Sequence, residues 1–189
     1  MNTLDFNFDP SSLLPDRRQL QLKCADYLAS SALKRNVQIN RNEQGAPYLP
    51  DANSYISISH TGNWMGVIIN EQSPSAIDIE FIHRQVGSVK SKFTTSAEIS
   101  MVKDVFGLNP EIFIWCCKEC LFKMLPFEGI HFKEQLLFVG VNKSDGGDHL
   151  STIWSVKHEN FNGQYLVNSF IFEGLLISYI DENGHLSTD

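Results

Sequence analysis

The chain has no excess of positive charge, no long hydrophobic run and few cysteines, and each shortage argues against a class of protein. Its 189 residues contain 15 lysines and arginines against 22 aspartates and glutamates, a formal net charge of −7. Nucleic acids and anionic membranes attract proteins through clustered positive charge, so general electrostatic binding to either is not expected. Any phosphate ligand must be met by a local basic pocket.

No stretch approaches the roughly 18 consecutive apolar residues of a membrane-spanning helix. The first residues, Met1 to Asp5, are polar and lack the basic flank and apolar run of a leader segment. Hydrophobic residues make up 42% of the chain and charged residues 20%, which is typical of globular proteins. We therefore expect a soluble cytoplasmic protein, most of which folds around its own core.

The four cysteines do not form a disulfide framework, because Cys24 stands far from Cys116, Cys117 and Cys120. A zinc site needs four ligands, which usually come in pairs on separate loops. The three neighbouring cysteines lie in a helical pattern, where cysteine behaves as a small hydrophobic residue. We expect them to pack in the core.

The hydrophobic spacing predicts a helix followed by strands, and then helices followed by strands. Thr95, with Glu98 three residues later, is a capping-box signature, and Asn109 followed by Pro110 marks another helix start. The expected helices are Leu13–Asn36, Thr95–Phe106 and Pro110–Leu125, and the expected strands are Ser54–Ser59, Trp64–Ile69, Ala76–Phe81, Leu136–Val141, Thr152–Val156, Tyr165–Phe172 and Leu175–Ile180.

This order of elements fits an α+β fold in two similar-sized halves, residues 1–75 and 76–189. Asn162-Gly163 is expected to form a hairpin turn between two C-terminal strands. The last residues, Asn183 to Asp189, are expected to fray.

Asp78 and Glu80 lie two positions apart in an apolar strand, so their side chains should share one face while Ile77 and Ile79 point to the other. An Asp-x-Glu pair is most often the solvated face of an edge strand. Like charges this close repel, however, and a bridging cation would remove that cost. The pair is therefore a candidate metal site.

Glu119 lies mid-helix with Trp115 four residues before it and Lys123 four after, so the three share one helix face. The common interpretation is an exposed Glu-Lys pair, and Lys118 is likewise most simply a surface lysine. Ser59 and His60 end a strand before a glycine turn, where a hydroxyl, an imidazole and free amides can meet an anion. A loop histidine is more often a structural hydrogen-bonding residue.

Five segments, taken together and in this order, resemble the 4'-phosphopantetheinyl transferase superfamily. The resemblance runs from about Arg17 to Gly129 and is closest to the longer type that activates surfactin synthetase, in which one chain holds two related α+β halves with the active site between them. The segments are Gly45–Tyr48, Ser57–His60, Ile77–Glu80, Phe93–Glu98 and Trp115–Lys123.

The resemblance implies that Asp78, Glu80 and Glu119 hold Mg²⁺. It also implies that Lys123 contacts the pyrophosphate of coenzyme A, and that Ser59 and His60 help to hold its phosphates. Magnesium prefers hard oxygen ligands, which agrees with three carboxylates and phosphate oxygens.

The implied reaction moves the phosphopantetheine arm of coenzyme A to a serine of an apo acyl or peptidyl carrier protein, as in fatty acid, polyketide or nonribosomal peptide biosynthesis. The serine hydroxyl attacks the β-phosphate, Glu119 takes its proton, and Lys123 with Lys118 offsets the developing charge. The family's built-in pairing of two halves implies a monomer.

Two positions depart from the family pattern. Ala46 stands where a phosphate-binding lysine is usual, and Ala76 replaces a glycine at a strand position that tolerates a methyl group. We expect Arg18, rather than Arg17 or Arg84, to supply the missing cation, because arginine can hold a phosphate with two donors. Ala46 also leaves open a non-catalytic carrier-protein or coenzyme A binding protein with the same fold, and a third interpretation is a plain α+β interaction domain.

Overall fold

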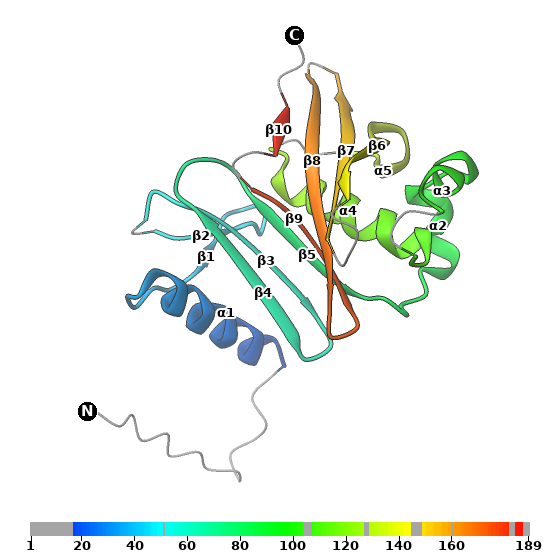
Figure 1. Cartoon of the computed structure of the whole chain (residues 1–189). Helices are drawn as coiled ribbons and strands as arrows, with labels where there is room; N and C mark the ends of the chain where they lie inside the picture. Colours follow the sequence, from blue (N-terminus) through cyan, green and yellow to red (C-terminus); the bar gives the residue numbers. More distant parts are fainter. Residues whose placement is uncertain are drawn as a thin grey trace.

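The structure is a computed structural model that describes residues 17–50, 52–103, 107–126, 129–144, 149–159, 161–181 and 184–186. Helices and strands are mixed along the chain (Figure 1). In chain order they are α1 (Arg17–Leu33), β1 (Asn40–Arg41), β2 (Pro47–Tyr48), β3 (Tyr55–Thr61), β4 (Trp64–Asn70), β5 (Ala76–Phe81), the 3₁₀ turn η1 (Gly87–Val89), α2 (Lys90–Phe93), α3 (Ser96–Val102), α4 (Pro110–Met124), α5 (Phe132–Gln135), β6 (Leu136–Ser144), β7 (His149–His158), β8 (Phe161–Phe172), β9 (Leu175–Ile180) and β10 (His185–Leu186).

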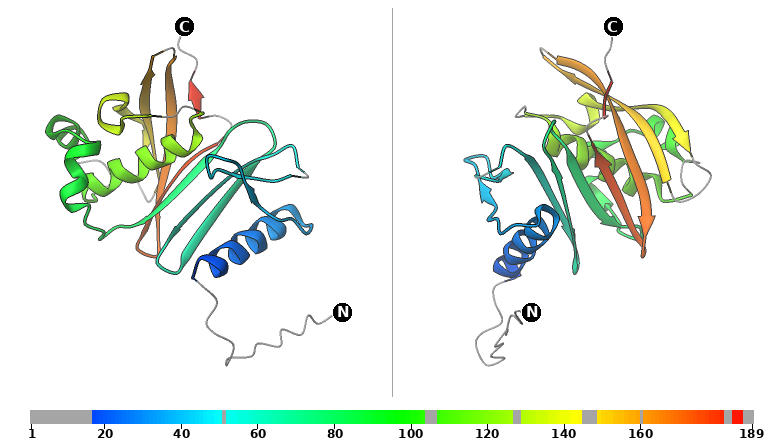
Figure 2. Two further views of the ribbon diagram at one scale, coloured as in Figure 1. Left: turned by 180° about the vertical axis from the view of Figure 1, so that it is seen from behind. Right: turned by 60° about the vertical axis from the view of Figure 1, so that its left-hand side comes forward.

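The largest sheet is antiparallel, in the order β5-β9-β8-β7-β6, with the short strand β10 beside β8. Strands β3 and β4 form a separate hairpin, and β1 pairs with β2. Helix α4 packs on one face of the large sheet, against β5 and β9, and α1 packs against β4 (Figures 1 and 2). The two helices therefore cover different sheets.

Helix α4 begins and ends where local chemistry dictates. The Asn109 side chain accepts the backbone N–H of Glu111 at 3.0 Å, and Pro110 occupies the first turn, where its missing N–H costs nothing. Leu125 leaves the helical conformation directly before Pro126. The helix starts where the sequence predicts and ends one residue earlier than expected, at Met124.

The main core lies between α4 and the large sheet, and a smaller core lies under α1. The first includes the fully buried Phe113 and Trp154 together with the three helix cysteines. The second is built on Ala29, Leu49 and Ile56. The large sheet and the β3–β4 hairpin are therefore packed by separate hydrophobic cores.

Strands β3 and β5 lie side by side and are joined by serine side chains. The Ser57 hydroxyl accepts the backbone N–H of Ile77 at 3.3 Å, and the Ser59 hydroxyl accepts that of Ile79 at 3.1 Å. Both contacts span 20 residues, so the two strands run in the same direction. The hydroxyls satisfy strand donors that would otherwise be buried without a partner.

The expected α+β class agrees with helices packed on antiparallel sheets. The two expected halves differ in content: the described part of 1–75 holds one helix and four strands, and that of 76–189 holds four helices and six strands. The likeness of the halves, and the boundary between them, stay predictions.

The expected turn at Asn162-Gly163 is wrong. Both residues lie inside β8, paired with Lys157 and Val156 of β7, and the chain reverses between His158 and Phe161. A Cβ at Gly163 would lie 2.7 Å from the Phe161 ring. Glycine is present there to make room for an aromatic ring, rather than to turn the chain.

Three other boundaries differ from expectation. Fraying of 183–189 is wrong for His185 and Leu186, which form β10 against β8. Helix α3 ends at Val102, and the expected extension to 106 falls partly on 104–106, outside the described residues. The expected start of the first helix, at 13–16, also lies outside them. No helix in the described ranges is both long and apolar enough to cross a membrane.

The serine contacts predict a stability effect. Ser57→Ala leaves the N–H of Ile77 without its acceptor, so the free energy of unfolding should fall by about 1–3 kcal/mol. Ser31→Ala, at an exposed position of α1, should change it by less than about 0.5 kcal/mol. Urea denaturation of both variants measures the difference, and equal stabilities would contradict a structural role for the Ser57 hydroxyl.

Candidate functional site

The alternation of β5 places its two carboxylates against helix α4. Asp78 and Glu80 are each only 5% exposed. Ile77 and Ile79 point the other way, toward β4, where a Cβ at Gly66 would lie 2.6 Å from the Ile79 side chain. The sequence prediction of two carboxylates on one face is confirmed, and the interpretation as a solvated strand face is wrong.

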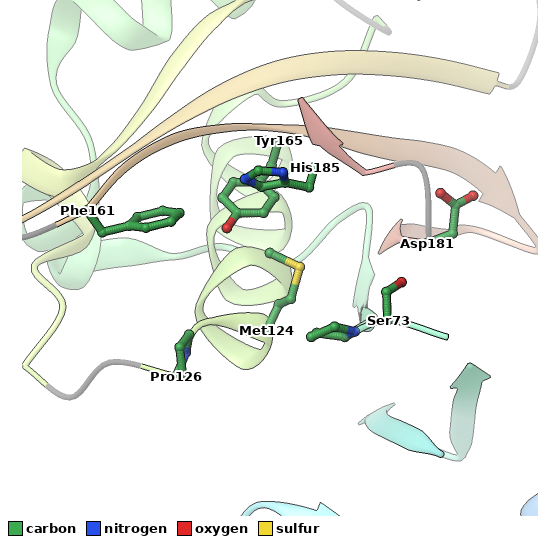
Figure 3. A pocket seen from close by; sticks show the side chains of 8 residues that line it. Ser73, Met124, Pro126, Phe161, Tyr165, Asp181 and His185 are labelled. Carbon is green, nitrogen blue, oxygen red and sulfur yellow. The ribbon is translucent and has the colours of Figure 1, made fainter. Parts of the chain in front are cut away.

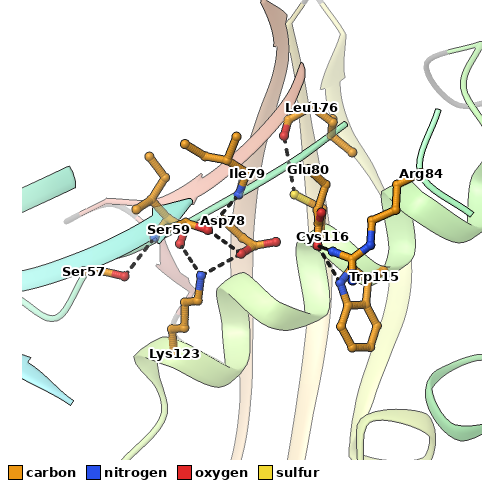
Figure 4. Close-up of polar contacts among 11 residues, drawn as sticks. Ser57, Ser59, Asp78, Ile79, Glu80, Arg84, Trp115, Cys116, Lys123 and Leu176 are labelled. Atoms are coloured by element: carbon orange, nitrogen blue, oxygen red, sulfur yellow. Dashed lines mark hydrogen bonds and ion pairs between the residues drawn. The ribbon is translucent and has the colours of Figure 1, made fainter. Parts of the chain in front are cut away.

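Asp78 is held by groups from two other elements (Figure 4). The Ser59 hydroxyl of β3 donates to its Oδ1 at 2.8 Å, and the Lys123 ammonium of α4 donates to the same oxygen at 2.6 Å. Lys123 also donates to the Ile77 carbonyl at 3.1 Å. The second carboxylate oxygen, Oδ2, is buried and has no hydrogen-bond partner among the described residues.

Glu80 is likewise held through only one of its two carboxylate oxygens among the described contacts (Figure 4). The Trp115 indole N–H donates to Oε1 at 2.9 Å, and the Arg84 guanidinium pairs with the same oxygen. Arg84 also lies 6.0 Å from the centre of the Trp115 ring, and its hydrogen bond to Glu80 raises the pKa of Arg84. Oε2 of Glu80 is again buried, with no partner in the described part of the chain.

The charges of both β5 carboxylates act on the Glu119 side chain of α4. Burial raises the pKa of Glu119 to about 7, with the charge of Asp78 and then that of Glu80 adding to the rise, while Lys123 and Arg84 oppose it. Glu119 is therefore partly protonated near neutral pH, unlike an ordinary carboxylate. The expected Glu119–Lys123 surface pair is replaced by the contact of Lys123 with Asp78.

This arrangement fits a hard cation. Two buried oxygens, one on Asp78 and one on Glu80, have no partner, and a buried polar atom in that state costs free energy. Burial is the main cause of the raised pKa of Glu119, and the negative charges of Asp78 and Glu80 add to it. Carboxylate oxygens are the ligands that Mg²⁺ prefers. Within the described ranges, no three His, Cys, Asp or Glu side chains are already gathered as a metal-holding group.

Lys118 lies away from these carboxylates. It is fully buried, and its ammonium donates to Glu98 Oε2 at 2.8 Å, to the Phe93 carbonyl at 2.8 Å and to the Phe132 carbonyl at 3.0 Å. Successive helix residues point about 100° apart, so Lys118 and Glu119 face different neighbours. The interpretation of Lys118 as a surface lysine is wrong, and the structure does not bring it together with Asp78 or Glu80.

The residues expected to hold phosphate are spread around the turn between β3 and β4. Ser59 is buried and its hydroxyl proton is used on Asp78, whereas His60 is exposed. Arg18 is exposed in the first turn of α1, and the neighbouring Arg17 donates to the Gly62 carbonyl at 3.2 Å. The start of α1 therefore lies beside the turn that follows His60.

Ala46, in contrast, is exposed in the turn between β1 and β2, where its N–H bonds to the Asn42 side chain.

The contacts of Trp115 and Arg84 with Glu80 were not expected from the sequence. Trp115 shares a helix face with Glu119, which was a signal that it lies at the site. Arg84 follows Glu80 by four residues, but β5 ends between them, so no regular spacing predicts the pair. Only the folded chain places the guanidinium on the carboxylate.

The helix cysteines pack in the core, as expected. Cys116, Cys117 and Cys120 are completely buried. Burial raises the pKa of Cys117 to about 12, so its thiol stays protonated.

A separate cavity of about 270 Å³ lies at the C-terminal end of α4 (Figure 3). Its walls are mostly apolar, and Met124, Phe161 and Tyr165 supply much of them. Met124 directly follows Lys123 in the chain.

The raised pKa of Glu119 predicts a pH-dependent stability. In the unfolded chain this carboxyl titrates near its ordinary 4.5, and in the folded metal-free protein near 7. Between these values the folded state binds the extra proton, so the contribution of Glu119 to stability is lost as the pH rises through that window. Glu119→Gln should therefore have a higher melting temperature than the parent at about pH 8, and the gain should vanish near pH 4.

The control for this prediction is Glu43→Gln, an exposed glutamate in a turn. Thermal unfolding in the presence of a chelator at both pH values measures the effect. A gain for Glu119→Gln that is the same at the two pH values would contradict the raised pKa.

The sequence is similar to that of a curated protein. No family model matches the chain. The chain is 33% identical over 110 residues to a Haemophilus influenzae protein named "Putative 4'-phosphopantetheinyl transferase", a match that covers 52% of this chain and 47% of the relative. The match thus spans about half the length of the curated relative. This likeness supports the resemblance to the phosphopantetheinyl transferase superfamily and a transferase function.

Proposed function

We propose that the chain is a magnesium-dependent 4'-phosphopantetheinyl transferase that moves the phosphopantetheine arm of coenzyme A to a serine of an apo acyl or peptidyl carrier protein. The observation that carries this proposal is the pair of buried, unpartnered oxygens, Asp78 Oδ2 and Glu80 Oε2, facing the helix that carries Glu119. The likeness to the Haemophilus influenzae protein supports the reaction class.

Asp78, Glu80 and Glu119 are the residues that would hold the metal. When bound, Mg²⁺ would neutralise phosphate oxygens and align them for transfer. Glu80 is fixed by Trp115 and Arg84, so its free oxygen is already oriented.

Glu119 is the proposed general base. Without a cation, burial and then the charges of Asp78 and Glu80 raise the pKa of Glu119 to about 7, whereas a bound cation would keep this carboxylate charged and able to accept a proton. It would accept the proton of the carrier serine as that hydroxyl attacks the β-phosphate of coenzyme A. The bond between the β-phosphate and 3',5'-adenosine diphosphate then breaks. Because the nucleophile belongs to the partner, the chain needs no activated serine of its own.

Lys123 is the proposed cation for the pyrophosphate. Its side chain is 26% exposed, so the ammonium can reach a ligand while remaining beside Asp78. His60 and Arg18 are exposed near the start of α1 and could bind further phosphate oxygens. Ser59 serves in this proposal to orient Asp78. Lys118 is given no contact with substrate, because all three of its protons are donated to protein oxygens.

The proposed site lies between the expected halves, residues 1–75 and 76–189. Strand β3 contributes Ser59, whereas β5 and α4 contribute the carboxylates and Lys123. The apolar cavity beside Met124 offers walls for the uncharged pantetheine arm. A site divided between two halves of one chain requires no second copy, so a monomer is proposed.

The first test measures transfer directly. The protein is mixed with apo carrier proteins of the fatty-acid and peptide-synthetase types, coenzyme A and Mg²⁺, and the carriers are weighed by mass spectrometry. The parent should add the phosphopantetheine mass. Glu119→Gln should lower the rate at least about 100-fold, because it removes the base and one metal ligand, and Asp78→Ala should abolish transfer.

The matched control is Glu43→Gln, which makes the same substitution at an exposed position in the β1–β2 turn. It should keep the parent rate. No mass gain on any carrier, together with measurable binding of coenzyme A, would support the non-catalytic binding protein instead. Full activity in both site variants would show that the catalytic residues lie elsewhere.

The second test measures the metal alone. Because Mg²⁺ would bind the folded chain only, it should raise the melting temperature of the parent, by an amount that grows with concentration. The increase should be smaller in Asp78→Asn, which lacks the charge but keeps the shape. An equal response in both proteins would place any bound magnesium away from Asp78.

A further inference from the structure

Two residues connect the buried Lys118 to the tryptophan of the site. The carbonyls of Phe93 and Phe132 both accept hydrogen bonds from the Lys118 ammonium. The rings of the same two residues lie against Trp115, with centroids 5.0 Å and 6.0 Å from its ring. Lys118 therefore holds the backbone of the two side chains that flank the indole.

The carboxylate partner of Lys118, Glu98, has hydrogen bonds on both of its oxygens. Glu98 Oε2 accepts from Lys118 and from the Thr94 hydroxyl, each at 2.8 Å, and Oε1 accepts the backbone N–H of Phe138 at 3.1 Å. The side chains of Lys118 and Glu98 are 0% and 5% exposed. A buried polar cluster with every donor and acceptor used is rigid, and it fixes the position of what surrounds it.

The elements that carry Phe93 and Phe132 need such an anchor. Phe93 ends α2 and Phe132 begins α5, and each of these helices has four residues. Helices this short are not stable alone in water, and a helix end leaves carbonyls without intrahelical donors. The Lys118 ammonium donates a hydrogen bond to one carbonyl of each helix and so holds both helices against α4.

We propose that Lys118 is a positioning residue: it anchors α2 and α5 so that their phenylalanine rings hold the Trp115 indole, which in turn fixes Glu80. The step from Trp115 to Glu80 is the 2.9 Å hydrogen bond from the indole N–H to Oε1. The inference rests on the proposed function in one respect, which is that Glu80 binds the metal. The positioning of Trp115 itself does not depend on that function.

The variant that tests this role must avoid leaving a buried charge unpaired. Lys118→Met alone would leave the Glu98 carboxylate buried without its cation, which is strongly destabilising and could prevent folding. The double variant Lys118→Met/Glu98→Gln removes both charges at similar volume, and the glutamine can still bond Thr94 and Phe138. The matched control is Lys92→Met, an exposed lysine on α2 next to Phe93.

The first measurement is the indole N–H resonance of Trp115 in an amide-proton NMR spectrum, assigned by its loss in Trp115→Phe. In the double variant the resonance should move away from its parent position, toward that of an indole without its carboxylate acceptor. In Lys92→Met it should stay in place. An unmoved resonance in the folded double variant would overturn the proposal.

The second measurement is a titration with Mg²⁺ alone. Loosening a residue that orients a metal ligand weakens metal binding by about tenfold or more, so the midpoint should rise by about that factor in the double variant and stay unchanged in Lys92→Met. An unchanged midpoint in the double variant would overturn the link to Glu80. A parent protein that binds no magnesium would contradict the proposed metal site, whereas the Trp115 resonance would still decide the role of Lys118.

Discussion

The site depends on one oxygen, Oδ1 of Asp78, where three elements meet. It accepts hydrogen bonds from Ser59 of β3 and from Lys123 of α4, while Asp78 itself belongs to β5. These two contacts connect the hairpin covered by α1 to the sheet covered by α4. They occupy Oδ1 and leave the buried Oδ2 without a hydrogen-bond partner in the described part of the chain. A charge-assisted contact thus serves both the fold and the chemistry proposed for it.

Helix α4 serves the same two purposes on its different faces. One face carries Trp115, Glu119 and Lys123 toward β5, and another carries the cysteines into the core. Lys118 lies between them, fully buried, and bonds to Glu98. A helix held by packing on one side and by a saturated ionic cluster on another has little freedom to rotate. The positions of Glu119 and Lys123 relative to Asp78 follow from that rigidity.

The sequence predicts features whose cause is local. Asn109 and Pro110 start a helix through contacts within one turn, and Asp78 and Glu80 share a face because strand side chains alternate. The burial and the hydrogen bonds of Lys118 could not be predicted in this way, because its acceptors lie 14 to 25 positions away along the chain. Tertiary packing thus overrides local preference at Lys118. The glycine at 163 misled for a different reason: its role is set by the ring of Phe161, two residues away in the same strand, whereas the Asn-Gly signal describes only the backbone.

The candidate site carries a cost in folding free energy when no cation is bound. Asp78 and Glu80 each bury an oxygen that no described group bonds, and this costs folding free energy. Burial, together with the charges of Asp78 and Glu80, also raises the pKa of Glu119, which is a further penalty for the folded metal-free chain above that pKa. A cation would offset both costs at once, since it would bond the free oxygens and return Glu119 to its charged form. Conflicts of this kind between local stability and sequence are expected where a chain is built to bind something.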